Sequence, residues 1–178
     1  PASASSQQKL LAELQHPDWK RRLKAVQDIE VDEDTFATIV ALLKDEKVAI
    51  RRWASALQGS SECAAAIPPL CEMLQGDRSA IARRTAGDAL SALGDPQASE
   101  AMITALEDGS SLVRWRASRF LTELGDETAV EPLMQAVETE PEFDVQVEMQ
   151  AAFERIQSGG EVQLPMWMRI SQGASGDQ

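Results

Sequence analysis

The chain has 178 residues, of which 43% are hydrophobic, and its formal net charge is -12 at pH 7. With four Phe and no Tyr, its core must be largely aliphatic and rich in alanine. No run of residues approaches the roughly twenty apolar positions that a membrane span needs, and no basic-then-apolar signal opens the chain, so we expect no membrane contact.

A repeated unit of about 30 residues runs along the sequence. An arginine marks this unit at Arg22, Arg51, Arg83 and Arg114, and Gln146 stands where a fifth would fall. Apolar residues recur at minus 1, plus 3, plus 6, plus 7 and plus 10 from this anchor position, which is one stripe of a helix. A second apolar helical segment precedes each anchor helix. Each unit is therefore predicted to be a helix pair.

Ten helices in five pairs are predicted. In chain order the pairs are 5–15 with 17–30, 33–44 with 46–58, 62–75 with 78–93, 96–107 with 110–124, and 127–139 with 142–157. The turn Gly94-Asp95-Pro96 supports these boundaries, because glycine ends one helix, aspartate caps the next and proline begins it. Since a lone pair cannot bury its apolar faces, the pairs should stack into a right-handed, all-α superhelix whose second helices line the concave side.

This solenoid is predicted to occupy residues 1–158. Residues 159–178 break the period and are predicted to form a tail that is rich in glycine and polar residues. Its polarity is interrupted only by Leu164, Met166, Trp167, Met168 and Ile170.

The cysteines and the single histidine limit the chemistry available. Cys63 and Cys71 lie on one predicted helix, about 12 Å apart along its axis, which is beyond the reach of a disulfide. They favour a reducing compartment, such as the cytoplasm, and small core positions. His16, in a His-Pro-Asp string at a helix start, is interpreted as a capping or loop residue. We predict no metal site, no cofactor and no catalytic residue.

The charges are unevenly distributed between the two helices of each unit. Acidic residues crowd the first helices and the turns, as at Asp32-Glu33-Asp34. Basic residues concentrate on the second helices: Lys20, Arg21, Arg22, Lys24, Arg51, Arg52, Arg83, Arg84, Arg114, Arg116 and Arg119. The predicted solenoid should therefore carry a basic inner band inside an acidic shell.

At 100° per residue, the anchor arginines lie on the flank of the core stripe. An aspartate precedes the anchor by six residues in three units. We interpret these residues as a structural ladder of ion pairs, within one unit or between neighbours, that fixes the stacking of the repeats. Its predicted members are Asp45, Arg51, Asp77, Arg83, Asp108 and Arg114.

A second set of basic and aromatic residues points away from the core stripe. Arg52, Arg84 and Trp115 stand one residue after the anchor, and Arg119 stands five after it. On such a stripe Trp115 has no core-packing role, which leaves two alternatives: it stacks with Arg119, or it anchors a bound peptide. The candidate partner-binding residues are Trp115, Arg84, Arg52, Arg119 and Arg116.

These helix pairs resemble HEAT repeats of the phycobilisome-lyase-like subtype. More narrowly, several strings resemble the HEAT region of the bacterial conserved virulence factor C family over about residues 8–170. They are HPDWK at 16–20, RRTAGDALSALGDP at 83–96, LVRWRAS at 112–118, EPEF at 140–143, ERI at 154–156 and the late Trp167. The resemblance implies a HEAT-repeat solenoid. Family members usually carry a NifU-like domain ahead of the repeats, to which no residues of this sequence correspond, and the resemblance defines no biochemical activity.

Three functions are compatible with these observations. The first is a non-enzymatic scaffold that binds an acidic or extended segment of a protein partner through the concave face. The second, by resemblance, is a bilin-lyase-like or iron–sulfur-related accessory role. A HEAT-type iron hydroxylase is excluded because it needs several His-Glu pairs and His16 stands alone. The third, nucleic-acid binding through the arginine band, is disfavoured by the net charge. No oligomeric state is predicted.

Overall fold

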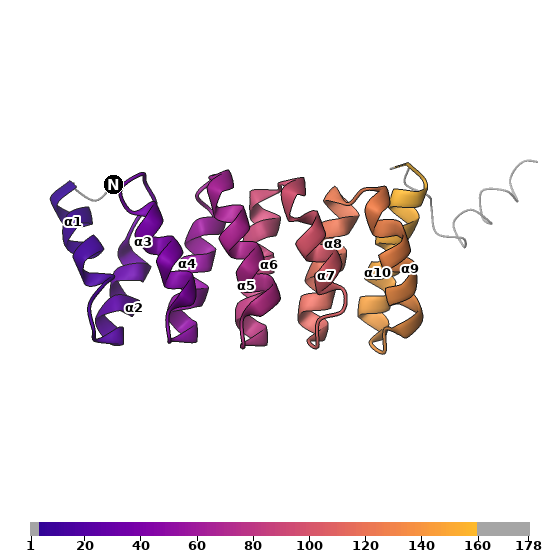
Figure 1. Cartoon of the computed structure of the whole chain (residues 1–178), viewed down its shortest axis with the longest axis horizontal. Helices are drawn as coiled ribbons and strands as arrows, with labels where there is room; N and C mark the ends of the chain where they lie inside the picture. Colours follow the sequence, from indigo (N-terminus) through magenta and orange to yellow (C-terminus); the bar gives the residue numbers. More distant parts are fainter. Residues whose placement is uncertain (1–3, 160–178) are drawn as a thin grey trace, which may run out of the picture.

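A computed structural model of the chain describes residues 4–159, so the tail predicted for 159–178 lies outside the described residues except for Gly159. Within the described part the chain forms ten α-helices and no strand. The helices follow one another along a single row of pairs, in chain order (Figure 1). The predicted all-α solenoid of five helix pairs is confirmed.

The five pairs have the following bounds. They are α1 (Ala4–Glu13) with α2 (Trp19–Asp28), α3 (Phe36–Ala41) with α4 (Val48–Gly59), α5 (Ile67–Gly76) with α6 (Ala80–Leu93), α7 (Ser99–Ala105) with α8 (Ser111–Leu124), and α9 (Val130–Thr139) with α10 (Phe143–Gln157). Short 3₁₀ turns extend the first helices of units two to five: η1 (Leu42–Lys44), η2 (Ala64–Ala66), η3 (Pro96–Ala98) and η4 (Glu127–Ala129).

Local capping explains where several elements begin and end. Gly94 ends α6 in the left-handed conformation, with a φ of 63°, which glycine adopts without steric cost. The side chains of Asp95 and Asp126 accept the backbone N–H groups of Gln97 and Thr128 and so begin the turns before α7 and α9. The predicted boundaries at these turns are therefore correct to within a few residues.

The core lies between the two helix layers and continues from unit to unit. In α6 and α8 it is formed by the predicted apolar stripe, including Ala86, Leu90, Val113 and Phe120, all of which are buried. The second helices also pack on one another in sequence order, α4 on α6, α6 on α8 and α8 on α10. The five second helices therefore form one continuous layer.

Ion pairs join each unit to the next at the turn between its two helices. Arg51 donates through Nε and Nη2 to the two carboxylate oxygens of Asp77, at 2.6 and 2.9 Å. Arg83 binds Asp108 in the same bidentate way, at 2.7 and 2.8 Å. The four links of this ladder are Arg22 with Asp45, Arg51 with Asp77, Arg83 with Asp108, and Arg114 with Glu140. The structure thus places the pairs between neighbouring units.

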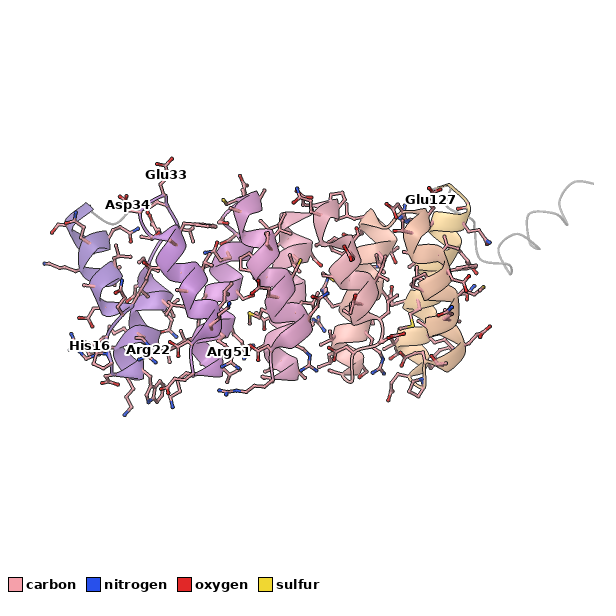
Figure 2. All side chains as sticks on the ribbon, viewed as in Figure 1. His16, Arg22, Glu33, Asp34, Arg51 and Glu127 are labelled. Carbon is pink, nitrogen blue, oxygen red and sulfur yellow. The ribbon has the colours of Figure 1, made fainter. Side chains whose placement is uncertain are left out.

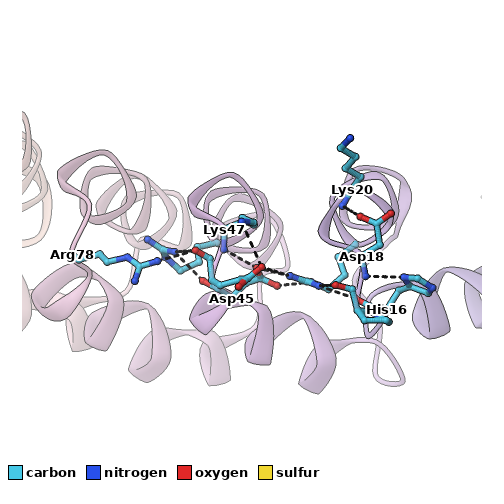
Figure 3. A network of polar contacts seen from close by, with 10 residues as sticks. His16, Asp18, Lys20, Asp45, Lys47 and Arg78 are labelled. Atoms are coloured by element: carbon cyan, nitrogen blue, oxygen red, sulfur yellow. Dashed lines mark hydrogen bonds and ion pairs between the residues drawn. The ribbon is translucent and has the colours of Figure 1, made fainter.

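Each link also holds the backbone of two turns. Arg83 donates through Nη1 to the carbonyl of Asp77 in its own unit, at 2.9 Å, while Asp108 accepts the backbone N–H of Ser110, at 2.8 Å. Figure 3 shows the equivalent contacts around Asp45, whose carboxylate accepts the N–H of Lys47. Because one guanidinium bridges two successive turns, the ladder fixes the register of the stack.

The ends of the ladder differ from its middle. Glu140 takes the place of an aspartate at the same offset before Gln146, and it and Arg22 are the two ladder members that were not predicted. Gln146 itself donates to the carbonyl of Val137, at 2.9 Å. At the other end His16 lies in the loop between α1 and α2, where its Nδ1 accepts the backbone N–H of Asp18 at 3.0 Å, in keeping with the predicted capping or loop role. Figure 2 shows His16, Arg22 and Arg51 along one edge of the stack and Glu33, Asp34 and Glu127 along the opposite edge.

We expect Arg83→Ala to lower the free energy of unfolding by about 1–3 kcal/mol, because it leaves the carboxylate of Asp108 poorly solvated and without its counter-ion. Urea unfolding at pH 7 measures the change. Arg52→Ala is the control, since Arg52 is exposed and its single hydrogen bond goes to Thr85; we expect a change below about 0.5 kcal/mol. Equal losses in the two variants would contradict a stabilising role for the ladder.

The ladder should also make stability depend on pH. Hydrogen bonds from Arg114 hold the pKa of Glu140 below its ordinary value, although burial acts in the opposite direction. A lowered pKa in the folded state means that the ionised carboxylate stabilises the fold above its unfolded-state pKa, and that this contribution is lost as the pH falls through the folded-state value. We expect the free energy of unfolding to decline below about pH 4.5.

Replacing Glu140 by Gln should flatten that decline in urea unfolding series recorded from pH 7 downwards. The matched control is Glu142→Gln, two residues on, whose side chain is exposed and makes no ion pair within residues 4–159. An acid profile of Glu140→Gln as steep as that of the wild type would show that Glu140 does not contribute to it.

Candidate binding surface on the second helices

The large apolar side chains that remain exposed are concentrated on the second helices. Of eight in the described part of the chain, only Met134 lies on a first helix. The other seven, between 36% and 74% exposed, are Trp19, Val48, Trp53, Ile81, Leu112, Phe143 and Val147. We call the solvent-exposed side of α2, α4, α6, α8 and α10 the second-helix face. Each of the five second helices contributes at least one of these exposed apolar side chains.

These residues were not predicted to form a site, although their recurrence is visible in the sequence. An apolar residue stands two or three positions before the anchor in every unit, away from the core stripe: Trp19, Val48, Ile81, Leu112 and Phe143. Exposed apolar residues that recur near the start of the second helix in all five units indicate a surface with a role in binding.

Trp115 is half-buried and packs against the core cluster. The guanidinium carbons of Arg84 and Arg116 each lie 5.2 Å from the centroid of its ring, within the range of a cation–π interaction. The structure therefore favours stacking, with Arg84 and Arg116 as the stacked cations in place of the expected Arg119. Trp115 joins α8 to α6, and its role as a peptide anchor stays a prediction.

Asp88 balances part of the charge around Trp115. Its Oδ1 lies 2.9 Å from Nε of Arg84 and 2.8 Å from Nε of Arg116. No role was predicted for Asp88, although it stands four residues after Arg84 on one helix, a spacing that allows an ion pair. The two arginines therefore contribute a local charge close to one instead of two.

Glycine lets the second helices approach one another closely. A Cβ at Gly87 would lie 2.8 Å from Cγ of Arg116, so the aliphatic stem of that arginine crosses α6 at this point. A Cβ at Gly59 would lie 2.7 Å from Cα of Ala89, so α4 and α6 nearly touch there. These contacts bring α4 close to α6 and place the stem of Arg116 against α6, beside Trp115.

The remaining predicted partner-binding arginines differ in availability. Arg52 is exposed, donates to Thr85 Oγ1 at 3.2 Å, and contacts no carboxylate among the described residues. Arg119 is half-buried, 3.5 Å from a carboxylate oxygen of Glu123 and 3.5 Å from one of Glu148. Among the five candidate residues, Arg52 thus offers the charge that is least compensated.

The second-helix face is graded in charge along the stack. Exposed Lys20 and Lys24 on α2 and Arg52 on α4 form its cationic end. Exposed Glu142 and Asp144, at the start of α10, form its anionic end. Between them the charges of α6 and α8 are mostly paired with one another. The expected basic band is therefore limited to the first units, and the last unit has the opposite sign.

An open pocket of about 370 Å³ lies at the anionic end of the face. Leu112, Trp115 and Val145 contribute apolar side chains to it, and Arg84 stands beside Glu142 and Asp144 in its lining. Asp88 compensates one of the two charges of Arg84 and Arg116, so the two exposed acids leave the surroundings of this pocket with a small net negative charge.

A larger hollow, of about 870 Å³, lies between α3 and α5 in the layer of first helices. Its walls include Val40, Pro68 and Met73, and its lower end reaches Asp45 and Asp77 of the ladder. Those two carboxylates are already bound by arginines, and none of the predicted partner-binding residues lines this hollow.

The two cysteines have the surroundings of structural residues. Both thiols are free. Burial raises the pKa of the Cys71 thiol to about 11, so it stays protonated and poorly nucleophilic. Cys63 precedes η2 in an extended conformation, so the prediction that both cysteines share one helix is wrong, because Ala64–Ala66 form a separate 3₁₀ turn.

Within residues 4–159, no three His, Cys, Asp or Glu side chains are grouped to hold a metal ion, and no helix is long and apolar enough to cross a bilayer.

Comparison with known proteins agrees with this architecture. The HEAT-repeat family model matches residues 8–90 and 67–153, and the chain belongs to this family. Two similar structures are crystal structures of engineered proteins from the Northeast Structural Genomics Consortium. The first has a TM-score of 0.55 and 22% identity, covering 88% of this chain and 81% of its own. The second has a TM-score of 0.50 and 18% identity, covering 86% and 99%. These likenesses concern the fold alone. The curated proteins contain no significant match.

We expect Gly59→Ala to lower the free energy of unfolding by about 1–3 kcal/mol, because the new methyl group would press on the backbone of Ala89 and separate α4 from α6. Gly76→Ala is the matched control: nothing lies within 4 Å of its added Cβ, and alanine is the better helix former. Urea unfolding of both variants tests the contact. A Gly59→Ala variant as stable as Gly76→Ala would contradict the close approach of the two helices.

Proposed function

We propose that the chain is a non-enzymatic scaffold that binds an extended segment of a protein partner along its second-helix face. The observation that carries this proposal is the concentration of exposed apolar side chains on the second helices, with Met134 as the one member on a first helix. Large exposed apolar side chains gathered on one helix layer are typical of a surface that a partner covers.

The surface also has the composition of a binding site. Large apolar side chains such as Trp53, Ile81 and Leu112 supply contact area, while charges at both ends supply specificity. The ladder holds the units in a fixed register, so little ordering of the scaffold is needed on binding. An extended segment suits a long, shallow face of this kind better than a compact ligand does.

The alternatives have less support. The ion pairs of Arg84, Arg116 and Arg119 reduce the charge available to phosphate groups, which favours a protein over a nucleic acid. The bilin-lyase-like and iron–sulfur-related roles rest on resemblance alone. So does the narrower assignment to the conserved virulence factor C family, which remains a proposal, as does a cytoplasmic or other reducing compartment.

A display library of random 12-residue peptides, selected on the full chain, supplies a defined probe. We expect a selected peptide, labelled and measured by fluorescence polarisation, to bind Leu112→Asp about tenfold more weakly than the wild type, because the charge removes an apolar contact where α8 meets the pocket beside α10. Met134→Asp, a similarly exposed position on α9, is the matched control and should bind normally. Equal melting temperatures establish that both variants fold.

Two outcomes would overturn the proposal. The first is a library that yields no peptide with saturable binding. The second is binding that survives Leu112→Asp but is lost in Ala37→Glu, an exposed position in the lining of the hollow between α3 and α5, because the partner would then sit on the layer of first helices.

A further inference from the structure

We propose that the second-helix face binds its partner in one charge order: acidic side chains of the segment lie over α2 and α4, and a basic side chain enters the pocket between α8 and α10. This inference rests on the proposed function and adds the chemistry of the partner. It differs from the expectation of a uniformly acidic partner, because the structure separates free cations from free anions along the face.

The cationic end is formed by side chains that have no acidic partner of their own. Lys20, Lys24 and Arg52 are exposed and make no ion pair among the described residues. Lys47, on the turn before α4, lies 5.6 Å from the ring centroid of Trp19, but it is paired with Glu46 and adds no free charge to this end. Acidic side chains placed here would find charges that are not already neutralised.

The anionic end has the form of a pocket. Leu112, Trp115 and Val145 give it apolar walls, while Glu142 and Asp144 are exposed and form no ion pair within residues 4–159. The long aliphatic stem of a lysine or arginine suits such walls, and its cationic head would meet the two carboxylates. An acidic side chain would be repelled at the same place.

The middle of the face sets the distance between these two charges. Trp53 and Ile81 are exposed there, and Asp88 binds the nearby arginines. Packed helices lie about 8–10 Å apart, so the three steps from α4 to α10 span about 24–30 Å. An extended chain advances about 3.3 Å per residue, so the acid and the base of the segment should be separated by about seven to nine residues, several of them apolar.

A charge-swap experiment tests this order with the peptide selected by display. Two variants of the full chain are used, Arg52→Glu and Asp144→Lys. We expect each to weaken binding about fivefold, because an exposed attraction becomes a repulsion. Reversing the acidic residue of the peptide should restore binding to Arg52→Glu only, and reversing its basic residue should restore binding to Asp144→Lys only. Glu138→Lys, exposed on α9, is the control for net charge and should bind like the wild type.

The outcomes separate this inference from the proposed function. If Leu112→Asp abolishes binding but neither charge variant changes it, the face binds a segment and the charge order is wrong. The order is also wrong if one reversed peptide restores binding to both variants, or if restored pairs show the opposite assignment of acid and base. If no selected peptide binds, both proposals fail.

Discussion

The bidentate bond between an arginine of one unit and a carboxylate of the next is the interaction on which the rest of the structure depends. Arg51 and Asp77 are each only 5% exposed, so both charges have lost most of their hydration. Such a pair is stable only if its geometry is good and its remaining hydrogen-bonding groups are satisfied. Here the arginine also binds a backbone carbonyl and the aspartate a backbone N–H, which meets that condition and makes stacking in any other register unfavourable.

A fixed register has consequences for the layer of second helices. Because the ladder lies at the turns where these helices begin, it aligns their N-terminal ends along one edge of the stack. Small residues then allow close packing further along: Gly59 lies against Ala89, and Gly87 lies under Arg116. Side chains of neighbouring units can therefore form ion pairs, as Asp88 of α6 does with Arg116 of α8.

A surface assembled in this way is shared among units, which suits recognition of a long segment. Each helix contributes few exposed side chains, so binding would depend on several units engaged together. A charge gradient along such a face would select the direction in which a segment lies, because the reversed arrangement places like charges together. The apolar contacts would then supply most of the affinity, and the charges most of the specificity.

The sequence by itself determined the helices, their pairing and the identity of most ladder residues, because these depend on periodicity and on caps within one unit. It left open whether Asp77 binds Arg51 or Arg83, since both lie on neighbouring turns and only the stacking brings Arg51 to the carboxylate. Glu140 was not predicted because the repeated residue at this offset is aspartate. Its longer side chain nevertheless reaches Arg114 as an aspartate would.

Only the tertiary structure decided the character of the second-helix face. The angle of Trp115 around a single helix pointed outward, yet the residue is half-buried because Arg84 comes from the preceding unit and lies against its ring. The arginines were predicted to form one basic band, but Asp88 and Glu148 on adjacent helices neutralise part of its charge. Helical periodicity describes each helix in isolation, whereas burial and charge pairing are set by neighbours about 30 residues away along the chain.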